Sequence, residues 1–302
     1  MTSGVFERET DLRDDGVSAK RIRTANWSSL LAAFVAGFTA LTIQVVCTRL
    51  AAQIFGSGTR TISTTIACSL LGLAIGSIVI GRLADKIRRP GIWLAGLLTL
   101  ASVISIAIGL FGRAVALEID QWMFAQFGTA GGLVVFSLAT LVPLNFMVGG
   151  VLPILVKSSW QGSATDSVSN LFGPLYASET LGGTIAALSV GFFSIQNFGM
   201  RRTAIATGLF GLAGAVAVFR TQAILRESTS HDSAAEDLNR KTGADYFLLV
   251  IVALAGSTSL AMEVIWQRFF VVLFGSDTHS FAMISAAFLI GCLLYTSSSP
   301  RD

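Results

Sequence analysis

The sequence predicts an all-α polytopic membrane protein, in which a six-helix unit is followed by the start of a second, parallel unit. Three observations support this fold class. Apolar residues make up 53% of the 302 residues and charged residues only 13%, with a mean hydropathy of +0.70, which is outside the usual range of a soluble domain. The apolar residues gather in runs of membrane-spanning length. A stretch from the first part of the chain also recurs near its end.

Eight apolar runs are long enough to cross about 30 Å of hydrocarbon as helices. Helices are expected because lipid cannot satisfy open backbone groups. The sequence also lacks the short segments of alternating polarity that are typical of a membrane barrel. The runs fall near 27–48, 62–80, 92–111, 131–156, 175–195, 203–219, 246–266 and from 281 onward.

An internal repeat relates GFTALTIQVVCTRLAAQIFGS at 37–57 to GSTSLAMEVIWQRFFVVLFGS at 256–276, 219 residues later. Extended without a gap to 36 positions, the copies share twelve identities, among them Arg49 with Arg268 and the turn FGSxT. Shared membrane composition would not align an arginine and a polar turn, so we interpret this as a true repeat. Because helices one and seven match, the period is six helices and the two units are parallel.

The predicted organisation has five segments. The first is charged, mixed in sign and too long for a signal peptide, so we expect a disordered cytoplasmic tail. The last, CLLYTSSSPRD, interrupts an apolar helix with a polar stretch that resembles a translated sequencing adapter, and we expect it to be non-native. The segments are the tail at 1–26, the first six-helix repeat at 27–219, a cytoplasmic linker at 220–245, helices seven and eight of a second repeat at 246–291, and the non-native end at 292–302.

Lysine and arginine give the orientation, since they collect on the cytoplasmic side of short loops. With the N-terminus inside, the inner segments hold fourteen of these residues and the outer segments hold six. A cytoplasmic N-terminus is therefore predicted. The net charge of +3 reflects this topology, so the lipid bilayer is the expected partner and nucleic acid is not.

The sequence lacks the motifs of several common catalytic and cofactor-binding sites. The sequence shows no glycine-rich nucleotide loop after a strand, no Walker loop, no nucleophile elbow and no histidine cluster. We therefore expect no catalytic residue, no metal site and no cofactor in this segment. Cys47 and Cys68 lie in apolar runs and are expected to be small buried hydrophobic residues. His231 and His279 are single loop histidines, expected at the surface.

Polar residues within the repeated helix are the first candidates for function. Glu263 lies inside the predicted seventh span, and an intramembrane acid is a functional candidate by default. It should face the bundle and pair with another helix, with Gln44 or Arg49 of helix one as candidate neighbours. Arg268 can extend to the interface.

Two further candidates lie in helices four and five. Asn145 belongs to a helix whose prolines and glycines should bend or break it and free backbone carbonyls, so that it either lines a cavity or is simply kinked. Glu179 lies about one turn inside helix five, where it either contacts a substrate or reaches the cytoplasmic interface. A GxxxG pair, Gly72 and Gly76, predicts close helix packing.

The loop GRLADKIRRPG at 81–91 resembles the signature loop of the major facilitator (MFS) transporters, whose two six-helix halves also match the period of the repeat. In that signature an acid and nearby basic residues latch neighbouring helices at the cytoplasmic face. The matching residues are Asp85, Lys86, Arg88 and Arg89, whereas Ile87 replaces the usual glycine. The alternative is an ordinary basic inner loop.

A more specific resemblance rests on FVAGFTALTIQVVCTRL, LLGLAIGSIVIGRLAD, GGVLP, YASETLGG and FGMRRT. Together these stretches resemble bacterial membrane proteins in which an MFS-like region is fused to a spermidine-synthase-like domain. The family's first-helix motif is complete in the second copy as Glu263, Trp266 and Arg268, and lacks its Glu and Trp in the first. The resemblance implies a multi-pass protein of the bacterial inner membrane, a small cationic or amine substrate, and an aminopropyltransferase-like domain downstream.

Two other functions remain open from the sequence. One is a stand-alone MFS-type secondary transporter, completed by further helices and nothing else. The other is a non-transporting membrane scaffold that holds partners. No sequence feature specifies an oligomeric state.

The charge distribution predicts that the N-terminus and the segment 220–245 are cytoplasmic and that Arg60, Phe127 and Arg201 face outward. Cysteine-accessibility labelling in intact cells measures this. A cysteine at position 232 should resist a membrane-impermeant reagent, because the membrane separates it from the outside. Brisk labelling at that position would contradict the predicted orientation.

Overall fold

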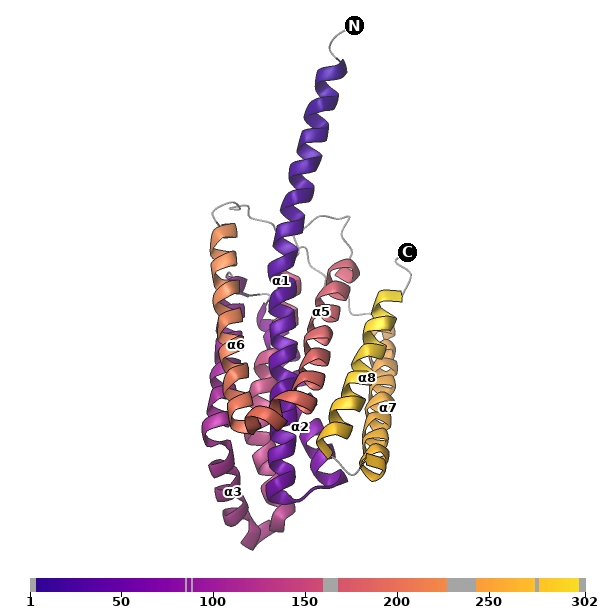
Figure 1. The fold of residues 1–302 in the computed structure, drawn as a ribbon. Helices are drawn as coiled ribbons and strands as arrows, with labels where there is room; N and C mark the ends of the chain where they lie inside the picture. Colours follow the sequence, from indigo (N-terminus) through magenta and orange to yellow (C-terminus); the bar gives the residue numbers. More distant parts are fainter. Residues whose placement is uncertain are drawn as a thin grey trace.

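The structure is a computed structural model that describes residues 4–84, 86–87, 89–159, 168–226, 243–274 and 277–298. Helices account for almost all of these residues, and no strand occurs among them. Figure 1 shows the helices as a bundle, with α7 and α8 side by side at one edge. The elements are α1 (Gly4–Phe55), α2 (Thr59–Ala84), α3 (Pro90–Gly149), α4 (Val151–Ser159), α5 (Val168–Ser189), the π-helix η1 (Val190–Ser194), α6 (Ile195–Arg226), α7 (Gly243–Phe274) and α8 (Asp277–Ser298).

Five stretches in the described part of the chain are long and apolar enough to cross a membrane. The last of them contains a chain reversal and so holds the predicted fifth and sixth runs. The predicted seventh and eighth runs fall in α7 and α8, where a shorter apolar stretch covers His279–Leu294. The chain is an all-α polytopic membrane protein. The five stretches are Trp27–Phe55, Thr59–Ala84, Pro90–Trp122, Gly128–Ser158 and Phe172–Arg220.

Two glycines reverse the chain inside long helical stretches. Gly128 in α3 has φ 66° and ψ −175°, and Gly199 in α6 has φ 77° and ψ 165°. Glycine adopts a positive φ with little strain because it has no Cβ. Each of these helices is therefore made of two segments that meet at a sharp turn.

Helices extend into both ends of the described chain, and the predicted tail at 1–26 and non-native end at 292–302 stay predictions. α1 begins at Gly4 and runs without a break into the first span, and α8 continues to Ser298. In Figure 1 the first part of α1 projects beyond the bundle. Once a helix is nucleated, each further residue adds one hydrogen bond at little cost, so a helix can extend beyond its apolar stretch into polar sequence.

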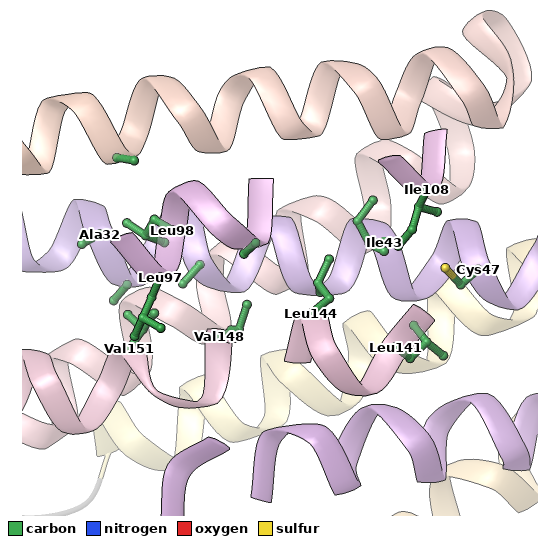
Figure 2. Packing of buried hydrophobic residues seen from close by; sticks show 14 of the residues in the cluster. Ala32, Ile43, Cys47, Leu97, Leu98, Ile108, Leu141, Leu144, Val148 and Val151 are labelled. Atoms are coloured by element: carbon green, nitrogen blue, oxygen red, sulfur yellow. The ribbon is translucent and has the colours of Figure 1, made fainter. Parts of the chain in front are cut away.

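α1 lies at the centre of the bundle. It packs against α3, α5 and α6, and also touches α2, α4 and α8. Three of its residues, Ala32, Ile43 and Cys47, are fully buried. Figure 2 shows Leu97 and Leu144, from the two segments of α3, beside this helix. Cys47 is thus a small buried hydrophobic residue, as predicted.

Glycines allow backbones to approach closely at two helix crossings. A Cβ added at Gly76 of α2 would overlap the carbonyl oxygen of Phe146 in α3. A Cβ at Gly182 of α5 would likewise overlap the carbonyl oxygen of Phe34 in α1. The predicted packing role of the GxxxG pair is confirmed, and α5 uses the same device against α1.

The predicted break in helix four is also confirmed. α3 ends at Gly149 and α4 begins at Val151. Pro153 has no N–H to give to the carbonyl four residues earlier, which is that of Gly149. The hydroxyl of Ser77 in α2 donates to this carbonyl oxygen at 3.1 Å. A side chain of the neighbouring helix thus replaces the missing helical hydrogen bond.

We predict that Gly76→Ala destabilises the protein by about 1–3 kcal/mol, because the added methyl group pushes against backbone that cannot move aside alone. Gly96→Ala is the matched control, since nothing lies within 4 Å of a Cβ at that position. Thermal unfolding in detergent, followed by size-exclusion chromatography, measures both variants. Equal melting temperatures for the two would contradict the close crossing of α2 and α3.

Candidate functional site

Three carboxylates of the described residues are half-buried: Glu179 on α5, Glu263 on α7, and Asp120 near the end of the first segment of α3. Glu179 and Glu263 lie farther inside their helices. Carboxylates at membrane depth are costly and usually serve binding or proton transfer. Among the residues that the structure describes, no group of three or more His, Cys, Asp and Glu side chains could hold a metal ion. Glu179 and Glu263 each have their own neighbours.

Glu179 lies where α5 crosses α1. Its backbone carbonyl sits against Gly37, where any side chain would overlap it. One turn along α5, Gly182 makes the reciprocal contact with the backbone of α1. The hydroxyl of Ser178 also donates to the carbonyl oxygen of Leu30 in α1, at 2.7 Å. This crossing fixes the position of Glu179 without using its side chain.

The carboxylate of Glu179 has an unsatisfied oxygen. Its Oε2 is buried and has no hydrogen-bond partner among the described residues. α5 begins at Val168, eleven residues before Glu179, so the acid lies roughly 16 Å into the helix. The predicted depth of about one turn was counted from the apolar run near Leu175 and stays a prediction, whereas the helix itself starts two turns earlier, at Val168. Glu179 therefore lies well inside α5.

α8 brings the second repeat against this crossing. Gly183 of α5 lies within ordinary contact distance of Leu41 in α1 and of Leu289 in α8. α8 packs extensively against α5 and touches α1. Glu179 is one turn from Gly183 on the same helix. It therefore lies close to the boundary between the first repeat and the beginning of the second.

Glu263 pairs with another helix, as predicted, but that helix is α8. Its Oε1 accepts a hydrogen bond from the hydroxyl of Ser285 at 3.1 Å and one from Nε2 of Gln267 at 3.4 Å. α7 packs against α8 and touches α2. Within the described residues α7 makes no contact with α1. The proposed neighbourhood with helix one was wrong, because α8 and α2 occupy the inner side of α7.

The remaining predicted residues make no hydrogen bond to either acid in the described part of the chain. Gln44 and Arg49 are half-buried on α1, and Arg268 is exposed on α7. Asn145 is fully buried at the crossing of α2 and α3, where its Nδ2 donates to the carbonyl oxygen of Leu141. Its Oδ1 has no partner in the described part of the chain. Asn145 packs close to Gly72, whose added Cβ would lie 2.9 Å from that of Asn145.

The predicted latch is described only in part, because Asp85 and Arg88 lie outside the described residues. Lys86 and Arg89 are exposed. A residue that the sequence analysis did not single out bridges this end of the bundle. Nζ of Lys157, in α4, donates to the carbonyl oxygen of Ala84 at the end of α2. Lysine suits this position because the carbonyls of a helix end are unsatisfied and carry partial negative charge.

A histidine expected at the surface instead lies between two helices. His279, in the first turn of α8, is half-buried. Its ring centroid is 5.2 Å from that of Phe192, in η1, and its Nε2 is hydrogen-bonded to Nε2 of Gln196. The sequence placed His279 in a loop, whereas the structure places it in the first turn of α8, where it keeps part of its surface exposed. This contact joins the two repeats at the end of the bundle opposite Lys157.

Comparison with known proteins adds one relative. A gentisate transporter of Corynebacterium glutamicum is 30% identical over 129 residues, which are 42% of this chain and 24% of that protein. The match thus spans about a quarter of the relative's length. The chain is a transporter-like membrane protein. No protein-family model matches it, and no solved structure matches it.

We predict that Lys157→Met lowers the free energy of unfolding by about 1 kcal/mol or more, because it removes a charged donor from the carbonyl of Ala84. Lys86→Met is the matched control, since Lys86 is exposed in the adjacent loop. Denaturation of the protein in mixed micelles measures both. Indistinguishable unfolding curves for the two variants would contradict a stabilising bridge between α2 and α4.

Proposed function

We propose that the chain is the membrane region of a transporter for a small cationic or amine solute. The similarity to a membrane transporter and the multi-pass helical bundle support the transport class. The observation that favours a cationic solute is the carboxylate of Glu179. It lies deep in the bundle, and its Oε2 is buried without a partner in the described residues.

A buried carboxylate oxygen favours a ligand that donates hydrogen bonds and carries positive charge. The site lies where α1, α5 and α8 meet, which is the boundary between the two repeats. Solute sites of repeat-built transporters lie at such boundaries, where relative motion of the units exposes them to either side. A solute bound at Glu179 would contact both repeats through α5 and α8.

The relative transports gentisate by name, and a carboxylate solute is therefore the competing proposal. An anion would need a positive partner inside the bundle. The half-buried basic residues of the described spans, Arg49 and Lys157, lie away from this site. Arg49 is twelve residues, or roughly 18 Å, along α1 from Gly37, the residue that Glu179 contacts, and Lys157 is bonded at the end of α2. The surroundings of Glu179 thus favour a cation over an anion.

The sequence motifs further support a fusion to a spermidine-synthase-like domain and a link to polyamine chemistry. We infer a cytoplasmic N-terminus and an inner-membrane location for the same protein. The genomic locus tests the fusion directly. A reading frame that encodes the synthase-like domain after the last helix supports it, and a frame that ends without one contradicts it and leaves the stand-alone transporter.

We predict that the protein expressed from its native gene takes up radiolabelled spermidine in liposomes and that Glu179→Gln lowers the initial rate at least about tenfold. The loss of one charge-assisted hydrogen bond is expected to have an effect of that size. Glu118→Gln is the matched control, because Glu118 is exposed on α3. Uptake of gentisate without uptake of spermidine would contradict the proposal and favour the anion transporter. Absence of uptake of either would favour the scaffold.

A further inference from the structure

We propose that the hairpin of α7 and α8 carries a separate binding site for a monovalent cation that donates hydrogen bonds, with Glu263 as its charge partner and Gln267 as its second acceptor. This site does not include Glu179. Ser285 of α8 completes it. The proposal concerns binding alone and stands whether or not the chain transports a cationic solute.

Glu263 is held in place by groups of the protein. The hydroxyl of Ser285 and Nε2 of Gln267 both donate to the same carboxylate oxygen, Oε1, at 3.1 and 3.4 Å. The second oxygen, Oε2, takes no part in these two bonds. One oxygen thus fixes the side chain and the other is available to a ligand. A carboxylate fixed in this way loses little further rotamer freedom on binding.

Gln267 provides an independent indication of a ligand. The side chain is 0% exposed, and its Oε1 has no hydrogen-bond partner in the described part of the chain. An unsatisfied buried amide oxygen is costly. This oxygen shares its amide carbon with the nitrogen that donates to Glu263, so it is separated from that hydrogen bond only by the width of the amide group. Two oxygen acceptors, one of them charged, are therefore carried by hydrogen-bonded side chains.

The internal repeat shows that packing alone does not require these groups. Position 48 of the first copy aligns with position 267 of the second. There, Thr48 donates to the hydroxyl of Thr65 across α1 and α2 at 3.1 Å. Two neutral hydroxyls thus bridge the first hairpin. At the corresponding level the second hairpin has a buried amide and a carboxylate. A bridge between two helices does not need a charged group, as the first hairpin shows.

The acceptors suit a hydrogen-bond donor better than a metal ion. A hard metal cation such as Mg²⁺ takes about six oxygen ligands, and the described residues contain no metal-binding group of acidic side chains. A primary ammonium or a proton carried by water needs fewer acceptors and gains charge-assisted hydrogen bonds from both oxygens. Both cations are positively charged hydrogen-bond donors, so both fit the acceptors of the site.

The other titratable groups on the packed elements lie away from Glu263, either along a helix or on its exposed side. On α8, His279 and Cys292 are six and seven residues from Ser285, roughly 9 and 10 Å along the helix. On α2, Arg60 and Arg82 lie near the two helix ends, with Cys68 buried between them. On α7 itself, Arg268 is exposed. Glu263 is thus the acid that decides the charge of this site.

Two measurements on the purified chain in lipid nanodiscs test the site and distinguish the two cations. Binding of radiolabelled methylammonium, with and without excess Na⁺, tests the ammonium. Infrared difference spectra recorded across pH test the proton, since a protonated carboxyl group has its own C=O band. We expect saturable methylammonium binding that Na⁺ does not displace, or a Glu263 carboxyl band that appears at low pH.

Variants assign the signal to the site. Glu263→Gln should weaken methylammonium binding at least about tenfold or abolish the carboxyl band, and Gln267→Leu should weaken binding several-fold. Ser257→Ala, exposed on the same helix, and Glu118→Gln, exposed on α3, should retain both signals. Size-exclusion chromatography selects folded variants, and Glu263→Asp should restore part of the signal. Unchanged signals in Glu263→Gln, displacement by Na⁺, or absence of both signals in the parent protein would overturn the proposal.

Discussion

Close contact between the backbones of α1 and α5 is the constraint on which the rest of the structure depends. It exists because Gly37 and Gly182 have no side chains, and a methyl group at either would overlap a carbonyl oxygen of the other helix. α1 can therefore lie at the centre of the bundle with α3 and α6 around it. The same contact presents Gly183 to Leu289 of α8. The position of the second repeat thus follows from the packing of the first.

This packing encloses polar side chains in an apolar bundle. Many hydroxyls in the described spans donate to a carbonyl in the preceding turn of their own helix, as Thr180 does, and so cost little. The carboxylate of Glu179 and the amide of Gln267 each retain a buried oxygen without a partner in the described residues. A helical bundle has no structural need for such groups, so their presence supports a binding function. They occur on either side of α8, which contacts both α5 and α7.

The sequence predicted the features that depend on local chemistry. Span lengths, the close-packed pair Gly72 and Gly76, and the break before Pro153 each follow from hydrophobicity or from the geometry of glycine and proline. The contacts between helices could not be predicted in the same way. The pairing of Glu263 with Ser285 depends on which helix lies beside α7, and the bridge from Lys157 depends on where α2 ends. Both are set by the rotation and neighbours of whole helices, which residue spacing does not encode.

Cross-linking between the two repeats is the most direct test of this account. Cysteines introduced for Gly183 and Leu289, in a chain without its native cysteines, should be joined in membranes by a short bifunctional thiol reagent, because a Cβ at Gly183 would lie 3.6 Å from Cδ1 of Leu289. A pair that combines Gly183→Cys with Leu254→Cys, exposed on α7, should not. Cross-linking only of the second pair, or of neither, would contradict the arrangement in which α8 closes the bundle beside Glu179.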